Sequence, residues 1–190
     1  ITNMNKLLVV ALALCGVFAA APARAQEPFT RSTGQVGGQV MFGAYVGQGD
    51  PNPYGLGLGA NAGYTLDFDL YLGGRFDYFF GGDDDTLVGE VSSNFLDLMF
   101  VAGYDIAAGE SFVVRPQLGL GWLWTRGEIC SANGCQDLDG DDEFNIAPGV
   151  RLLWRLFQPL YLTGEISYNN VFAERNVDGI VFAIGAGGFF

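Results

Sequence analysis

Apolar residues alternate with polar or small residues over most of the chain, from Gly34 to Phe190. Successive side chains of a β-strand point to opposite faces, so this period of two predicts strands rather than helices. Most runs have about the 9–11 residues that a tilted strand needs to cross a bilayer. The eight runs that we predict as strands are 34–46, 54–66, 70–80, 95–104, 112–125, 143–156, 160–168 and 179–190.

The links between these runs alternate in length. Those after the second, fourth and sixth runs are short, at 67–69, 105–111 and 157–159. The others are longer on the whole, at 47–53, 81–94, 126–142 and 169–178. Short turns at one end and longer loops at the other are typical of an up-and-down barrel. The sequence therefore predicts an all-β fold, an eight-stranded antiparallel up-and-down β-barrel.

One face of these strands is bulky and apolar, and the other is rich in glycine. Eight strands enclose barely enough room for ordinary side chains, so the bulky face is predicted to point outward, into lipid. The alternative is a soluble lipocalin-like barrel with its apolar face inside, but glycine without lysine would make a poor water-facing exterior. The bulky set is Leu56, Leu58, Phe76, Tyr78, Phe80, Leu118, Leu120, Trp122, Trp124, Ile146, Val150, Leu152 and Trp154, and the small set is Gly55, Gly57, Gly59, Gly63, Gly119 and Gly121.

Composition supports a transmembrane barrel. Glycine (29 of 190) and aromatic residues (14%) suit turns and pleated surfaces better than helices. Beyond the N-terminal segment no apolar run reaches the roughly 18–20 residues of a spanning helix, so only strands could cross a membrane. Aromatic residues also gather near strand ends, as in interfacial girdles. They are Tyr54, Tyr64, Tyr78, Tyr104, Trp124, Trp154 and Tyr168.

The first 25 residues have the features of a secretory signal peptide. A short basic start at Lys6 precedes an apolar run, and Ala23-Arg24-Ala25 provides a cleavage site. A membrane anchor helix is the alternative, but the run is short for a span. Lipoprotein processing at Cys15 is disfavoured by the bulky Leu14 before it. We expect 1–25 to be removed, 26–33 to form a short lead and 34–190 to form the barrel domain.

Charged residues on the glycine-rich face would lie in the lumen, where charge is costly unless it is paired. Arg151 and Glu165 are about equally far from the turn at 157–159, so we expect them to face each other. Asp97 and Arg115 lie near-diagonally about the link at 105–111. The predicted lumen ion-pair network is Arg75, Asp77, Asp97, Arg115, Arg151 and Glu165.

Two hypotheses for the lumen follow. The last, first and second strands present mostly glycine and alanine, so arginine and acidic side chains could fill the lumen against this glycine wall and plug it. Alternatively, a narrow polar conduit or small-solute cavity runs along the same wall. A wide water channel is excluded, because open pores need about 16 strands.

The longest loop contains Cys130 and Cys135. In an oxidising compartment such a pair is expected to close a small disulfide ring, with metal binding as a weak rival. Asp137, Asp139 and Asp141 follow and match a calcium loop only in part, because Gly140 comes after the second acid of the pattern rather than the third. Together with an acidic cluster at 83–85, these residues predict either solvated acidic loops or a site where divalent ions bridge to anionic lipid heads.

Charge and composition exclude several functions. The net charge is −12, and removal of residues 1–25 takes away Lys6 and Arg24 and no acid, which gives −14. No basic patch for nucleic acid is visible. The chain contains no histidine, and its acids are assigned to lumen pairs or loops, so we predict that it is not an enzyme and needs no cofactor.

The cleavage signal, the eight alternating strands and the terminal Phe190 resemble the small outer-membrane β-barrels of the OmpA/OmpX type, over essentially all of 34–190. The resemblance implies the outer membrane of a Gram-negative cell, with both termini periplasmic. It also implies that the barrel-assembly machinery reads the last strand through Phe182, Ile184 and Phe190. Enzymatic barrels of this kind use a histidine, which this chain lacks.

From these observations we expect a structural or surface-interaction protein that contacts outer-membrane lipids and lipopolysaccharide and is a monomer. A narrow pore or small-solute transporter is the alternative.

Overall fold

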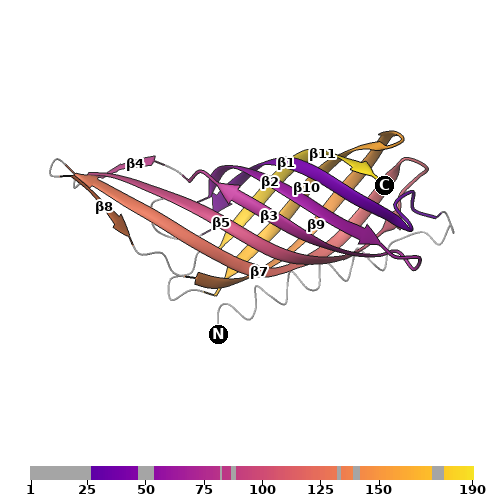
Figure 1. Ribbon diagram of the computed structural model, residues 1–190, viewed down its shortest axis with the longest axis horizontal. Coiled ribbons are helices and arrows are strands. Elements are labelled where there is room, and N and C mark those ends of the chain that lie inside the picture. The colour runs from indigo at the N-terminus through magenta and orange to yellow at the C-terminus, as the bar shows by residue number, and fades with distance from the viewer. Residues whose placement is uncertain are drawn as a thin grey trace.

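The computed structural model describes residues 27–46, 54–81, 83–86, 89–131, 134–138, 142–172 and 178–190, with only the backbone for 83–93 and 126–138. These residues form one closed, antiparallel β-barrel (Figure 1). No helix within these ranges is long and apolar enough to span a membrane. The eight long strands are β1 (Thr33–Tyr45), β2 (Gly55–Thr65), β3 (Leu70–Phe79), β5 (Gly89–Tyr104), β7 (Phe112–Ser131), β9 (Asp142–Phe157), β10 (Leu160–Val171) and β11 (Gly179–Phe189). The predicted fold class is therefore confirmed.

Pairing of β11 with β1 closes the barrel, from Gln35 opposite Phe189 to Tyr45 opposite Gly179. A row of directly paired residues that starts at Thr33 on β1 runs once around the barrel. It returns to β1 at Gly43, ten residues further along the strand. Such a stagger tilts the strands, as closure of a barrel requires. The row passes through Thr65, Tyr71, Gly103, Gln117, Gly149, Ser167 and Val181.

Three short strands accompany the long ones: β4 (Asp83–Thr86), β6 (Ile106–Ala107) and β8 (Gly134–Leu138). We predicted 81–94 and 126–142 as loops, and this is wrong for much of both segments. β4 pairs with the start of β5, and β8 pairs with the end of β7. Regular pairing thus continues past the barrel, and in Figure 1 β4 and β8 lie at the end opposite the C-terminus. We call the C-terminal end, where the short links lie, the turn end and the other the loop end.

The inside-out assignment predicted from the sequence is correct. On the outward face, Trp122 is 55% exposed and Phe182 is 50% exposed, whereas Arg75 and Arg115 are 3% and 0% exposed. An exterior covered by large apolar side chains is unfavourable in water and favourable in lipid. The alternative of a soluble barrel with its apolar face inside is therefore wrong.

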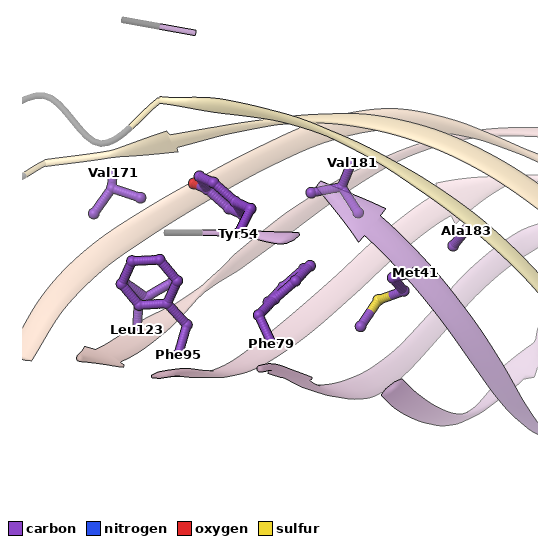
Figure 2. Packing of buried hydrophobic residues seen from close by; sticks show 8 residues of the cluster. All are labelled: Met41, Tyr54, Phe79, Phe95, Leu123, Val171, Val181 and Ala183. Atoms are coloured by element: carbon purple, nitrogen blue, oxygen red, sulfur yellow. The ribbon is translucent and has the colours of Figure 1, made fainter. Parts of the chain in front are cut away.

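The loop end of the lumen is filled by an apolar cluster that we did not predict (Figure 2). We assigned Tyr54 to an outer aromatic girdle, but it is fully buried in this cluster. Its ring lies edge-on to Phe79, with centroids 5.4 Å apart, and 5.6 Å from that of Phe95. The glycines at positions 43 and 179 leave room for it. We call this cluster the apolar cap: Met41, Tyr54, Phe79, Phe95, Leu123, Val171, Val181 and Ala183.

The lead before β1 folds against the turn end. Phe29 packs on a cluster of Val113, Leu153 and Tyr161, with its ring edge-on to Phe189 at 5.4 Å. Arg31 forms two hydrogen bonds, of 2.6 and 2.7 Å, to the carboxylate of Asp69 in the β2–β3 turn. This ion pair raises the pKa of Arg31. The lead is therefore part of the folded barrel rather than a free linker.

Candidate functional site

The middle of the lumen contains a closed ring of hydrogen-bonded side chains. Arg75 donates to both Asp77 and Glu165. Arg151 donates from Nε to Glu165 Oε2 at 2.7 Å and from Nη2 to Gln39 Oε1 at 3.0 Å. Gln39 closes the ring, since its Nε2 donates to Asp77 Oδ1 at 3.1 Å. We call these five buried residues the central network.

The central network connects opposite walls of the barrel. Arg75 lies on β3 and Glu165 on β10, and three strands separate them whichever way the barrel is followed. Arg151 and Glu165 lie directly opposite each other on β9 and β10, the relationship that we expected from their turn. The network therefore fixes the relative positions of strands far apart in the sheet.

A second group, the turn-end network, lies closer to the short turns. Arg115 contacts Asp105 through Nε at 2.5 Å and through Nη2 at 2.9 Å. Its Nη2 also donates to Gln35 Oε1 at 3.0 Å, on the opposite wall. The Thr65 hydroxyl accepts a hydrogen bond from Gln35 and donates one to Asp105. The guanidinium carbon of Arg115 lies 3.7 Å from the ring centroid of Tyr71.

The expected proximity of Asp97 and Arg115 is wrong. The register places Asp97 opposite Leu123 and Arg115 opposite Arg151, so the two arginines are cross-strand neighbours. Like charges in this position repel, and each arginine extends toward a different network. The partner of Arg115 is Asp105, which we left in a turn. In β5 every second residue faces the lumen. Continuing this alternation one residue beyond Tyr104 would have placed Asp105 inside.

The predicted glycine wall is contacted by tyrosine rings as well as by the ion-pair network. A side-chain carbon at Gly187 would overlap the hydroxyl of Tyr161, and one at Gly63 would overlap the ring of Tyr71. Tyr161 also donates to the backbone carbonyl of Val36 at 3.3 Å. These small residues therefore give space to large rings that reach them from neighbouring strands.

A third polar group lies between the central network and the apolar cap. Asn145 on β9 donates from Nδ2 to Asp97 Oδ2 on β5 at 2.6 Å, and both residues are fully buried. Asp97 is directly opposite Asp77, yet none of the ion pairs found among the described side chains includes Asp97. Asn145 is a lumen residue that our candidate ion-pair set did not contain.

The remaining predicted residues are placed only in part. Cys130 and Cys135 lie directly opposite each other in the β7–β8 hairpin, which is a backbone relationship and leaves the disulfide a prediction. Of the calcium candidates, Asp137 has only its backbone described, and Asp139 and Asp141 lie outside the described residues. Residues 1–25 also lie outside them. Phe182, Ile184 and Phe190 all face outward on or beside β11, at 50%, 71% and 81% exposure.

The buried polar networks of the lumen can hold the strands of the barrel in a single register. Replacing a buried ion pair with apolar residues is often neutral, whereas removing one partner typically costs about 3–5 kcal/mol. Networks that link opposite walls therefore penalise any slip of strand register. Among the described residues, no group of three or more histidine, cysteine or acidic side chains could hold a metal ion.

Comparison with solved structures finds the same architecture. Ail, the attachment invasion locus protein of Yersinia pestis, matches with a TM-score of 0.61 and 16% identity, covering 84% of this chain and 99% of Ail. Neisserial surface protein A matches with a TM-score of 0.62 and 15% identity over 83% and 97% of the two chains. The outer membrane protein AlkL matches with a TM-score of 0.52 and 14% identity over 89% and 94%.

At these identities the likeness shows the fold alone. No curated protein sequence matches this chain at a significant level. The sequence model of the outer membrane protein β-barrel domain matches residues 10–190, which is nearly the whole chain. The resemblance inferred from the alternating strands is therefore confirmed: the chain belongs to the outer membrane protein β-barrel domain family, whose members are proteins of the outer membrane.

Proposed function

We propose that this protein has a structural and surface-interaction role in the outer membrane, with a lumen closed to solutes. The observation that carries the proposal is the Arg75–Glu165 ion pair, which crosses the lumen from β3 to β10. The turn-end network makes a second crossing from Arg115 to Gln35. The apolar cap at one end and Phe29 at the other support the same reading.

The alternative of a narrow pore is less well supported. The conduit was expected along the glycine wall, and Tyr54, Tyr71 and Tyr161 lie against glycines of that wall. We also propose that the protein is not an enzyme, because the sequence offers no histidine as a base.

The surface role rests on the part of the sheet beyond the barrel. Here β4, β5, β7 and β8 pair in continuous register, and alternate residues share a face. Asp85 is opposite Glu90, and Glu128 is opposite Asp137. By this register, five acids share one face of the sheet: Asp83, Asp85, Glu90, Glu128 and Asp137.

We infer that this acidic face is extracellular and meets divalent ions, which would bridge it to the anionic heads of lipopolysaccharide. Both termini would then be periplasmic, since the described ends of the chain lie at the turn end. The names of two structural neighbours, an attachment invasion locus protein and a surface protein, support a role at the cell surface. The net charge of −12 disfavours direct binding of a polyanion without such bridging ions.

Conductance in planar bilayers tests the closed lumen. The wild-type protein is expected to give no channels, with a general porin as the positive control. The variants Arg115→Ala and Arg151→Ala show whether the networks keep it closed, after a gel-mobility check that each barrel has folded. Steady unitary conductance from the wild type would overturn the closed lumen and favour a transporter.

Thermal melts with calcium or a chelator test the acidic face. Calcium should raise the melting temperature of the wild type in lipopolysaccharide-containing vesicles. It should have little effect on a variant with Asp83→Asn, Asp85→Asn, Glu128→Gln and Asp137→Asn. Equal melts with calcium and chelator would count against divalent bridging.

A further inference from the structure

One buried acid of the lumen, Asp97, takes part in none of the ion pairs among the described side chains. Each arginine has its own acid: Arg75 contacts Asp77, Arg115 contacts Asp105, and Arg151 contacts Glu165. Asp97 is a further lumen acid, it is fully buried, and none of these pairs includes it. An isolated carboxylate in this position is strongly unfavourable, so a compensating positive charge is expected.

Several buried oxygens around Asp97 also lack hydrogen-bond partners. Asp97 Oδ2 accepts from Asn145 Nδ2, which leaves Asp97 Oδ1 and Asn145 Oδ1 without partners. On β10, Ser167 Oγ and both side-chain polar atoms of Asn169, Oδ1 and Nδ2, are likewise unpartnered, and both residues are at most 3% exposed. Because buried polar atoms are nearly always satisfied, these four oxygens together indicate a bound group.

The strand register places Asn145 and Asn169 side by side on the inner face, with Ser167 next along β10. Asn145 is opposite Val171 on β10, so Asn169 is its diagonal neighbour on the same inward face. Ser167 lies two residues further along that face. Asp97 is opposite Asp77 of the central network and two residues from Phe95 of the apolar cap. The group therefore lies between the two, closed toward both ends of the barrel.

We propose that Asp97, Asn145, Asn169 and Ser167 bind a single sodium ion inside the barrel. Carboxylate, amide and hydroxyl oxygens are the ligands that hard cations prefer. One positive charge cancels the charge of the Asp97 carboxylate, so a monovalent ion fits better than a divalent one. Water alone would satisfy the hydrogen bonds but leave the charge uncompensated. A proton on Asp97 would neutralise the charge but leave the oxygens of Asn169 and Ser167 without a partner.

Equilibrium urea unfolding of the full chain in detergent micelles tests this proposal, because an ion that binds only the folded state stabilises it by mass action. Sodium chloride is varied against choline chloride at constant ionic strength. At saturating sodium, the unfolding equilibrium constant should fall about tenfold for each tenfold rise in sodium. The variant Asp97→Asn, which has nearly the same shape, should lose this dependence.

Asp178→Asn is the matched control, since the Asp178 carboxylate accepts hydrogen bonds from Tyr168 and Asn170 outside this group. Its sodium dependence should equal that of the wild type. If Asp97→Asn fails to fold, Asn169→Ala and Ser167→Ala replace it, and each should weaken the response. Identical wild-type unfolding in sodium and choline, or a full sodium response in Asp97→Asn, would overturn the site. Neither result bears on the closed lumen, which conductance tests separately.

Discussion

Arg75 and Glu165 form a buried ion pair although they lie on opposite walls of the barrel, 90 residues apart in the sequence. Glu165 also accepts from Arg151, so one carboxylate compensates two guanidinium groups. Asp77 and Gln39 complete the ring from the other side. Loss of Glu165 would therefore disturb two buried guanidinium groups at once.

Glu165→Gln is therefore expected to destabilise the barrel by about 3–5 kcal/mol, the usual cost of leaving buried charges without their partner. Urea unfolding in detergent micelles, followed by tryptophan fluorescence, measures the change. Arg155→Gln is the control: its guanidinium reaches the Glu110 carbonyl at an exposed position, so its loss should cost less than about 1 kcal/mol. Equal losses for the two variants would show that the central network does not hold the strands.

The sequence predicted lumen contacts correctly only where the two residues lie on strands joined by a short turn. The Arg151–Glu165 relationship followed from the turn at 157–159, because a tight turn fixes the register of its two strands. The Asp97 and Arg115 interpretation failed since it used a longer link, within which Asp105 continues the inward face of β5. Contacts between opposite walls, such as Arg75 with Glu165, depend on the stagger of the closed barrel, which no local pattern reveals.

The lead gives a second prediction. Asp69 holds the Arg31 guanidinium through two hydrogen bonds, so trypsin should cleave slowly after Arg31 in the folded protein. Asp69→Asn should accelerate this cleavage, because it removes the charge that holds Arg31. Asn tolerates the positive φ of 67° at this position, so the turn should be retained.

Asp67→Asn is the control, since Asp67 accepts from Ser32 in the same turn, whereas the ion pairs of Arg31 among the described side chains are with Glu27 and Asp69. Digestion followed by mass spectrometry distinguishes the two variants. Cleavage that is equally fast in the wild type and in Asp69→Asn would mean that the lead is not held by this ion pair.

Glycine on the inner wall supports a third prediction. Gly187→Ala should destabilise the barrel by about 1–3 kcal/mol, because the added methyl group would overlap the Tyr161 hydroxyl and crowd the Val36 carbonyl. Gly74→Ala adds the same group where nothing lies within 4 Å. Denaturant unfolding should therefore separate the two. A Gly187→Ala variant as stable as Gly74→Ala would contradict a filled lumen on this side.

The hairpin beyond the barrel supports a fourth prediction. Cys130 and Cys135 are directly opposite on β7 and β8, and cross-strand Cα distances fall in the range that a disulfide spans. In protein isolated from an oxidising compartment, neither thiol should react with an alkylating reagent until a reductant is added. Labelling of both thiols without reductant would refute the disulfide.

The parity of the alternation was the most reliable feature of the sequence, and its limits were at strand ends. It placed Arg75 inside and Trp122 outside, as the structure shows. It did not identify Tyr54 as a lumen residue, because that tyrosine precedes β2 and resembles an interfacial aromatic residue. The pairing of β4 and β8 was missed for a related reason: acidic, glycine-containing segments have the composition of loops, and only the register of β5 and β7 extends the sheet through them.

The central claim is that the bulky face contacts lipid, and the three tryptophans test it without any mutation. Trp122, Trp124 and Trp154 all lie on the outward face. When the protein is reconstituted into vesicles of lipids with brominated acyl chains, tryptophan fluorescence should be strongly quenched, while aqueous iodide should have little effect. Unchanged fluorescence in brominated lipid, with efficient quenching by iodide, would contradict the outward assignment.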